Sequence, residues 1–471
     1  MGKRNILRLI LAAALIVGMW IFANGSTDQV HAAESLKPAA PALDDFLAPV
    51  TQKTEVPEGY TGIYTAEQLI AVTDAPDQNY ILMADIDVSF YSWEPLCTED
   101  EPFAGIFDGN GHVISNLNGT NGLFADTLSA QIQNVGIRNG SISASFDNQS
   151  WGQIGGIAGQ AGNGTTISNC YYQGNIESNA CVVGGITGGC GRADVTIEDC
   201  WMKGDTLSTN EGSSQDQLFI GGIVGGALST SFEIKGCTHS GSIEVQGYNA
   251  YAGGIAGYGD GHIVYCQNYG TIQSSTYAHA GGIISTFNSA RDGSIEYCIN
   301  AADITAVGGN VYMGGITGIS HMNIRNCFNC GNLSANGSNL YYVGGIAGLG
   351  SAEYCYSTGT VTGAKGKTGA LFGAAGGDSA YCYCLEGELE AYGYRGSSWE
   401  ITDVRAFSDS EMRDQTNFQG YDFDSVWQMG LGDYPYPVLL EIVREETPEE
   451  ENPSADCLFC LKRISVWYTD L

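Results

Sequence analysis

The stretch that decides the fold is Gly155-Gly156-Ile157-Ala158-Gly159, followed by Ile167-Ser168-Asn169-Cys170 and then by Gly174-Asn175-Ile176. This order recurs along the chain at intervals of 25 to 37 residues, a spacing typical of stacked repeat units. An earlier copy, Gly122-Leu123-Phe124 with Ile132-Gln133-Asn134-Val135, has Val in place of Cys. The Gly-Gly-Ile elements start at Gly155, Gly184, Gly221, Gly253, Gly281, Gly314 and Gly344, with a weaker copy at Gly369. The matching cysteines are Cys170, Cys200, Cys237, Cys266, Cys298, Cys327, Cys355 and Cys382.

One copy of this unit offers only a few short strands, which cannot bury an apolar face alone. Stacking the copies at the inter-strand spacing of roughly 4.8 Å makes parallel sheets with a shared core. The isoleucines of the Gly-Gly-Ile elements then form an inward column: Ile157, Ile186, Ile223, Ile255, Ile283, Ile316 and Ile346. The paired glycines permit close backbone approach or a positive φ. The residues before the cysteine position suit a left-handed turn: Asn134, Asn169, Asp199, Gly236 and Asn326.

The composition agrees with this interpretation. The 471-residue chain has 66 Gly and only 15% charged residues, which favours many short strands joined by tight turns over long helices. We therefore predict an all-β chain whose middle is a β-solenoid.

The N-terminus is typical of a secretory signal peptide. Lys3, Arg4 and Arg8 precede an apolar stretch from Leu9 to Ala23, and a cleavage site of small residues follows at Val30-His31-Ala32, with a second option after Gly25. An uncleaved anchor is the alternative, although the apolar stretch is short for a membrane-spanning helix. We expect a secreted or cell-surface protein whose mature chain is not inserted in a membrane.

The net charge of the chain limits the classes of partner that it is expected to bind. The chain has a net charge of −33, and removal of residues 1–32 takes away three basic residues and one acidic residue, leaving −35. Nucleic acids and anionic lipids need a basic patch, so neither is an expected partner. The oligomeric state is not predicted.

The repeat copies resemble the GLUG-motif repeats of secreted and cell-surface bacterial proteins. The run from Tyr80 to Asp87, with Phe103 to His112, looks like the first coils before such arrays, and Phe423-Asp424-Ser425-Val426-Trp427 with Tyr436-Pro437-Val438-Leu439 is similar to their closing segment. The resemblance implies a right-handed parallel β-helix of the pectate-lyase-like kind at a bacterial surface. It implies no single activity.

The working model is a β-helix of about ten coils with a cap at each end. Its segments are a signal peptide (1–32), a linker (33–58), an N-terminal cap and first coils (59–121), the repeat β-helix (122–390), a C-terminal cap (391–440) and an acidic tail (441–471). We expect order to begin near Tyr60, a short helix over residues 64–70, and strands at residues 80–83 and 86–88. The segment 400–440 is expected to cover the C-terminal end of the stack.

No catalytic, metal or cofactor site is predicted. The repeat cysteines are expected to form a column of packed thiols, with disulfide pairing as the alternative. Cys327-x-x-Cys330 and Cys457-x-x-Cys460 have zinc-like spacing but lack a second pair of ligands. Carboxylates and histidines are scattered, and the His-Glu-x-x-His motif is absent from the sequence.

An aromatic row directly after the cysteine position is the candidate binding site: Tyr171, Trp201, Phe328, Tyr356 and Tyr383. If the cysteine points inward, its neighbour points outward, and a line of rings could stack on sugars or on a protein. The alternative is that these rings lie beneath loops or that the parity is reversed. The predicted function is a non-catalytic binding or adhesion scaffold for glycans or surface proteins. The alternatives are a polysaccharide-active lyase or hydrolase and a purely structural spacer.

Overall fold

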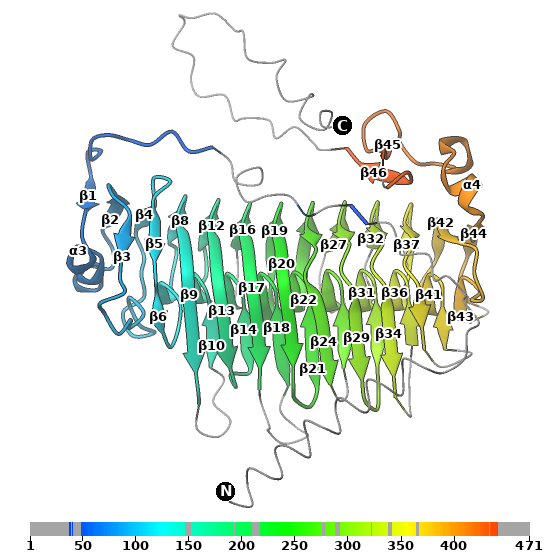
Figure 1. The fold of residues 1–471 in the computed structure, drawn as a ribbon, viewed down its shortest axis with the longest axis horizontal. Coiled ribbons are helices and arrows are strands. Elements are labelled where there is room, and N and C mark those ends of the chain that lie inside the picture. The colour runs from blue at the N-terminus through cyan, green and yellow to red at the C-terminus, as the bar shows by residue number, and fades with distance from the viewer. Residues whose placement is uncertain are drawn as a thin grey trace, which may run out of the picture.

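The chain is a parallel β-helix, as the sequence predicted (Figure 1). The computed structural model describes residues 37–38, 40 and 49–440, apart from 147–151, 192–193, 210–216, 276–277, 288–292, 322, 338–341, 364–366, 397 and 433. The predicted signal peptide, residues 1–32, and the predicted acidic tail, residues 441–471, lie outside the described residues.

Each sequence repeat forms one coil, and the first full repeat has four strands. The repeat at Gly155 consists of β10 (Gln153–Gly155), β11 (Ala158–Ala161), β12 (Thr166–Ser168) and β13 (Tyr171–Ser178). These strands pair in parallel with the same elements of the next repeat: β14 (Val182–Gly184), β15 (Thr187–Cys190), β16 (Val195–Glu198) and β17 (Trp201–Ser208). The register therefore places equivalent side chains of successive repeats in columns along the axis.

Four ladders of strands run along the helix. The Gly-Gly ladder is β10, β14, β18 (Leu218–Gly221), β21 (Ala250–Gly253), β25 (His279–Gly281), β30 (Tyr312–Gly314), β35 (Tyr342–Gly344) and β40 (Thr368–Gly369). The second is β7 (Phe124–Thr127), β11, β15, β19 (Val224–Lys235), β22 (Ala256–Val264), β26 (Ile284–Phe287), β31 (Thr317–Ser320), β36 (Ala347–Gly350), β41 (Phe372–Ala375) and β43 (Tyr392–Tyr394).

The third ladder leads to the cysteine corner: β1 (Tyr60–Ile63), β2 (Asn79–Leu82), β4 (Ile106–Asp108), β8 (Gln131–Gln133), β12, β16, β19, β22, β27 (Ser294–Glu296), β32 (Asn323–Arg325), β37 (Ala352–Glu353), β42 (Ser379–Leu385) and β44 (Ile401–Phe407). The fourth leaves it: β3 (Ile86–Asp87), β5 (Val113–Ser115) with β6 (Asn118–Gly119), β9 (Gly136–Ala144), β13, β17 and β20 (Thr238–Val245). Later coils split this strand into two: β23 (Gln267–Asn268) and β24 (Thr271–Ser275), β28 (Ile299–Asn300) and β29 (Ile304–Val307), β33 (Phe328–Asn329) and β34 (Leu333–Asn336), β38 (Tyr356–Ser357) and β39 (Val361–Thr362).

The predicted isoleucine column lies inside the helix, and each of its seven side chains is fully buried. The paired glycines serve close approach rather than a positive φ. A Cβ on Gly156 would lie 2.4 Å from the carbonyl oxygen of Gly185 in the next coil and equally close to the ring of Tyr172. The second glycine of each pair therefore makes room for an inward side chain of the same coil, which ranges in size from Tyr172 to Ser357.

The cysteine corner is left-handed in every coil, as predicted for five of its residues. Asn134, Asn169, Asp199, Gly236 and Asn326 have φ values between 49° and 61°. The sequence did not indicate that four tyrosines occupy the same position, with φ between 52° and 58°: Tyr265, Tyr297, Tyr354 and Tyr381. Bulky side chains are rare in this conformation, so the stacked fold, rather than local preference, imposes it.

A hydrogen-bonded polar column lies inside the later coils. The Nδ2 amides of Asn268 and Asn300 donate to the Oδ1 atoms of Asn300 and Asn329 at 2.8 and 2.7 Å, and Asn329 donates to Ser357 Oγ at 3.1 Å. His239 begins the column, with its Nδ1 2.9 Å from Asn268 Oδ1. Complete burial lowers the pKa of His239 to about 4, so its imidazole is neutral.

The N-terminal end carries the predicted short helix, α3 (Ala66–Ile70), which Thr65 caps and η1 (Ala71–Asp74) follows. The prediction for the C-terminal end is wrong in part. Strand β44 pairs with β42 and belongs to the stack itself. The residues after it, α4 (Asp409–Met412), η2 (Gln415–Asn417) and the antiparallel pair β45 (Trp427–Met429) and β46 (Pro437–Leu439), lie along one long edge of the helix instead (Figure 1).

Candidate binding face

The predicted aromatic row forms one column in part of the structure. Tyr171 pairs with Trp201, and Phe328, Tyr356 and Tyr383 occupy equivalent places on β33, β38 and β42. The predicted exposure of the row is wrong, because all five side chains are buried. Tyr171 and Trp201 retain 7% and 2% of their surface, and the other three retain none. These five rings are therefore not accessible to a ligand.

The two N-terminal rings are buried by their own neighbours on the outer surface. The ring of Tyr171 lies where a Cβ of Gly136 would be, and the guanidinium of Arg138 is 5.7 Å from its centroid. The indole of Trp201 donates from Nε1 to Ser240 Oγ at 2.8 Å. Both rings therefore lie along adjacent strands instead of projecting outward.

The three C-terminal rings lie beneath residues 408–440, which we call the C-terminal cover. Phe328 stacks on Tyr356 with centroids 5.0 Å apart, and the indole of Trp427 lies 6.2 and 5.9 Å from these two rings. Trp427 also donates from Nε1 to Asn326 Oδ1 at 3.3 Å. Together with Tyr383, Phe407, Met412, Phe418, Tyr421, Tyr434 and Tyr436 they form a second hydrophobic core outside the helix.

Polar contacts inside this second core fix the position of the cover. The hydroxyl groups of Tyr356 and Tyr434 are 2.8 Å apart, and Tyr356 also donates to the carbonyl of Pro437. Tyr383 donates to Asp403 Oδ2 at 2.8 Å. Burial raises the pKa of Tyr356 and of Tyr434 well above the usual value, which keeps both phenols neutral.

Order begins before Tyr60, contrary to the prediction, because part of the expected linker is attached to the helix. Lys53 Nζ forms an ion pair with Asp108 Oδ2 at 2.8 Å, and the Lys53 backbone exchanges hydrogen bonds of 2.7 and 3.1 Å with the side chain of Asn110. Burial alone would raise the pKa of Asp108, but hydrogen bonds from Lys53, Asn110 and Asn134 outweigh it and lower this pKa. Residues 49–58 are thereby held on the first coils.

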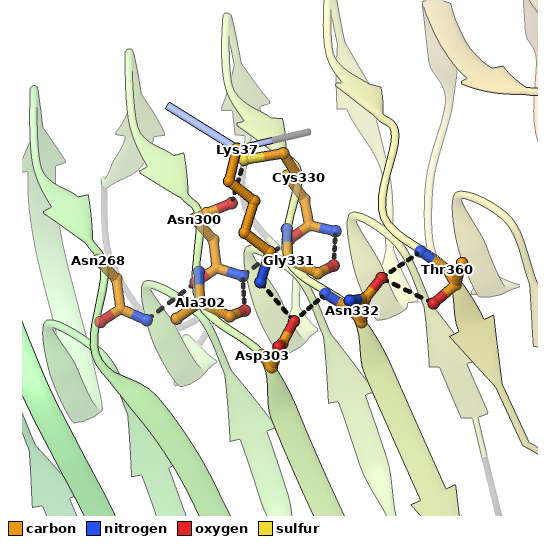
Figure 2. A network of polar contacts seen from close by, with 10 residues as sticks. Lys37, Asn268, Asn300, Ala302, Asp303, Cys330, Gly331, Asn332 and Thr360 are labelled. Carbon is orange, nitrogen blue, oxygen red and sulfur yellow. Dashed lines mark hydrogen bonds and ion pairs between the residues drawn. The ribbon is translucent and has the colours of Figure 1, made fainter. Parts of the chain in front are cut away.

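A second N-terminal contact lies far along the helix. Lys37 Nζ is 2.6 Å from Asp303 Oδ1, and the backbone amide of Asn332 donates to the same oxygen at 2.7 Å. The Asn332 side chain in turn accepts from the amide and hydroxyl of Thr360 at 3.0 and 2.7 Å (Figure 2). This outer polar row crosses three coils beside the inner column of Asn268 and Asn300 that the same view shows.

The repeat cysteines are packed thiols, as predicted. All eight are fully buried, and none of these eight is joined in a disulfide. Each repeat thiol lies near the carbonyl of the residue two positions before it; Cys298 Sγ, for example, is 3.2 Å from the Glu296 carbonyl. Burial raises the pKa of Cys200, Cys237 and Cys298 well above 9, so these thiols are protonated.

A different aromatic column remains partly exposed on the Gly-Gly ladder. It contains the outward side chains two positions before five successive Gly-Gly pairs: Phe219, Tyr251, His279, Tyr312 and Tyr342. The exposed Lys367 occupies the same position in the next coil. Successive ring centroids are 5.1, 4.6, 5.0 and 5.8 Å apart, with planes tilted by 32° to 58°. Phe219 is buried at one end, and the other four rings retain exposed surface.

A second outward column lies beside the first on β22, β26, β31 and β36: Tyr258, Thr286, Ile319 and Leu349. All four side chains are partly exposed. The ring of Tyr258 is 5.0 Å from Phe219 and 5.6 Å from Tyr251, and Thr286 Oγ1 is 3.0 Å from His279 Nδ1. We call the two columns from Phe219 to Leu349 the tyrosine face.

The tyrosine face is uncharged at neutral pH. Its members include no Asp, Glu, Lys or Arg, although the whole chain has a net charge of −33. Burial lowers the pKa of His279 to about 4 and raises the pKa of Tyr251 and Tyr258 above 10. The imidazole and the phenols are therefore neutral, and the face differs from the acidic remainder of the molecule.

The repeat sequence contains a signal for this face. The same alternation that places Cys inward makes Ile220, Ala252 and Val343 point inward, so the residues before them point outward. At that place, four of five successive repeats have an aromatic side chain and the fifth has a histidine.

The described residues contain no group of three or more His, Cys, Asp or Glu side chains that could hold a metal ion. None of the helices in the described segments is both long and apolar enough to cross a membrane.

No family model matches the chain. The sequence is similar to Halomucin of Haloquadratum walsbyi, with 35% identity over 133 aligned positions that cover 24% of this chain and 1% of that protein. The chain therefore spans a very small part of this relative. The fold is similar to that of a Bacteroides ovatus protein assigned as a candidate immunoglobulin A1 protease, with a TM-score of 0.38, 20% identity, and coverage of 80% of this chain and 91% of that one. An IgA1 protease gives a TM-score of 0.39 and 18% identity over 68% of this chain and 21% of that one.

Proposed function

We propose that the chain is a non-catalytic scaffold, displayed outside the cell, which holds a macromolecular partner on the tyrosine face. The observation that carries this proposal is the partly exposed column Tyr251, His279, Tyr312 and Tyr342 on a rigid parallel β-helix. Aromatic side chains with a polar edge give large contact area at a small entropic cost, which makes them frequent at binding surfaces. The resemblance to GLUG repeats and the signal-like residues 1–32 support export to the cell surface.

The position of the face suits this role. The C-terminal cover lies along one long edge of the helix, whereas the strands β10, β14, β18 and β21 of the Gly-Gly ladder lie toward the opposite edge (Figure 1). Lys37 and Lys53 attach the N-terminal segment through Asp303 and Asp108 on other ladders. The tyrosine face is thus separate from the surfaces that fix the two ends of the described chain.

The test is a panel of polysaccharides and mucin glycans, scored for retention of the full chain and for product release. The variant Tyr251→Ala/Tyr312→Ala/Tyr342→Ala should lose at least about 100-fold in retention, because central aromatic anchors each contribute more than 1 kcal/mol. The control is Tyr265→Asn/Tyr297→Asn, which removes two stacked rings from the cysteine corner and inserts a residue suited to its positive φ.

Retention of the wild type and the control, without new products, would support the proposal. Equal retention of the tyrosine variant would refute it. Release of new reducing ends or unsaturated products would favour a polysaccharide-active enzyme.

A further inference from the structure

This inference rests on the proposed function and identifies the partner class: we infer that the tyrosine face binds a linear, uncharged polysaccharide that lies along the axis of the β-helix.

The aromatic column is periodic along the axis of the β-helix. Five successive coils place one ring each in this column, at centroid separations of 4.6 to 5.8 Å. Equivalent groups repeated at one spacing fit a ligand that is itself extended and repetitive. An unbranched polysaccharide has this form, whereas the surface of a folded protein is irregular.

The chemistry of the two columns also fits a sugar chain. Partly exposed aromatic rings can contact sugar C–H groups, and the phenol hydroxyls can exchange hydrogen bonds with sugar hydroxyls. The adjacent column adds the apolar side chains of Ile319 and Leu349 and the Thr286 hydroxyl. A sugar chain presents apolar and hydroxyl groups in alternation, so it can satisfy both columns at once.

The two columns from Phe219 to Leu349 include no Asp, Glu, Lys or Arg. A cation, Lys367, follows only in the coil beyond Tyr342, at the end of the aromatic column. The surrounding chain is strongly acidic, with a net charge of −33, so it repels polyanions. Neutral glycans avoid this repulsion, and glycans of uronic acids do not.

The experiment measures the affinity of the full chain for neutral oligosaccharides of increasing length by calorimetry. The probes are xylo-, manno-, cello- and chito-oligosaccharides of two to eight sugars, with oligogalacturonates of the same lengths as the charged series. In at least one neutral series the affinity should rise with each added sugar and become constant once the ligand spans the column. Tyr342→Ala should shorten that limiting length, because it removes the terminal ring, and Tyr297→Asn should leave it unchanged.

Stronger binding of oligogalacturonates than of every neutral series would overturn the inference. If no oligosaccharide binds, yet retention of the chain on mucin still depends on the tyrosines, the partner class is wrong and the binding face stands. If nothing depends on the tyrosines, the proposed function fails as well.

Discussion

Two aromatic columns run along this β-helix, and they differ in solvent exposure. The column after the cysteine corner, Phe328, Tyr356 and Tyr383, is completely buried beneath the C-terminal cover. The column before the Gly-Gly pair retains exposed surface on Tyr251, Tyr312 and Tyr342. Strand alternation places both columns outside the coil. Alternation therefore indicates which side of a strand a residue is on, but not whether another segment covers it.

The largest loss of stability is expected from a substitution at the residue that anchors the C-terminal cover. Trp427→Ala should lower the free energy of unfolding by about 3–5 kcal/mol, since a fully buried indole and its contacts with Phe328 and Tyr356 are lost. Urea denaturation measures the change, and limited proteolysis should cut first within residues 408–440. If the variant is as stable and as resistant as the wild type, the cover does not depend on this contact.

A matched pair of ring deletions sharpens the comparison. Phe328→Ala should cost about 3–5 kcal/mol because it leaves a cavity in the second core. Tyr342→Ala should cost only about 1 kcal/mol, because its ring is partly exposed and stacks mainly on Tyr312 at 5.8 Å. Equal losses in thermal or urea unfolding would contradict the assignment of one column as covered and the other as open.

His239 and His279 allow the burial of neutral imidazoles to be tested through the pH dependence of stability. His239 is enclosed in the coil, and its pKa of about 4 lies below the ordinary 6.5. The unfolded chain therefore binds a proton first, and as the pH falls from 6.5 to 4 stability should decrease by at most about 1.4 kcal/mol per pH unit. His239→Asn and His279→Asn should each flatten this slope to a similar extent, because burial lowers the pKa of both imidazoles to about 4. Identical slopes in wild type and His239→Asn would show that His239 is not buried as a neutral group.

The smallest expected effect is on thiol labelling. Cys327 lies inside the helix, whereas Cys330 belongs to the second core, and burial raises the pKa of Cys330 to about 12. A thiol reagent should modify neither in the native chain. Loosening the cover by Trp427→Ala should expose Cys330 and leave Cys327 protected, as peptide mapping by mass spectrometry will show. Modification of both at one rate would mean that the cover and the helix open together.

The repeat itself was sufficient to predict the fold. Isoleucine, cysteine and glycine at fixed places determine what a coil can bury, and the structure has all three where the pattern required them. The left-handed corner was predicted only where Asn, Asp or Gly revealed it, so the four tyrosines in the same conformation were missed. Their backbone is imposed by stacking, which local sequence does not encode.

The covered row could not be predicted because its partners are remote in sequence. Trp427 contacts Asn326 across 101 residues, and Lys37 contacts Asp303 across 266. No repeat pattern extends into those segments, so the docking depends on tertiary packing alone. The tyrosine face, in contrast, can be predicted from strand alternation, because each ring of the column before the Gly-Gly pair directly precedes an inward side chain of the repeat.

The central claim is that the open aromatic column is the binding face, and hydroxyl-radical footprinting of the full chain tests it most directly. Without ligand, Tyr251, Tyr258, Tyr312 and Tyr342 should be oxidised and Tyr356 and Tyr383 should not. With a retained glycan, the first group should be protected, whereas Tyr64, which is 51% exposed beside the first strand, should stay reactive. Protection at Tyr64 without protection at Tyr251 and Tyr342 would place the partner elsewhere and contradict the account.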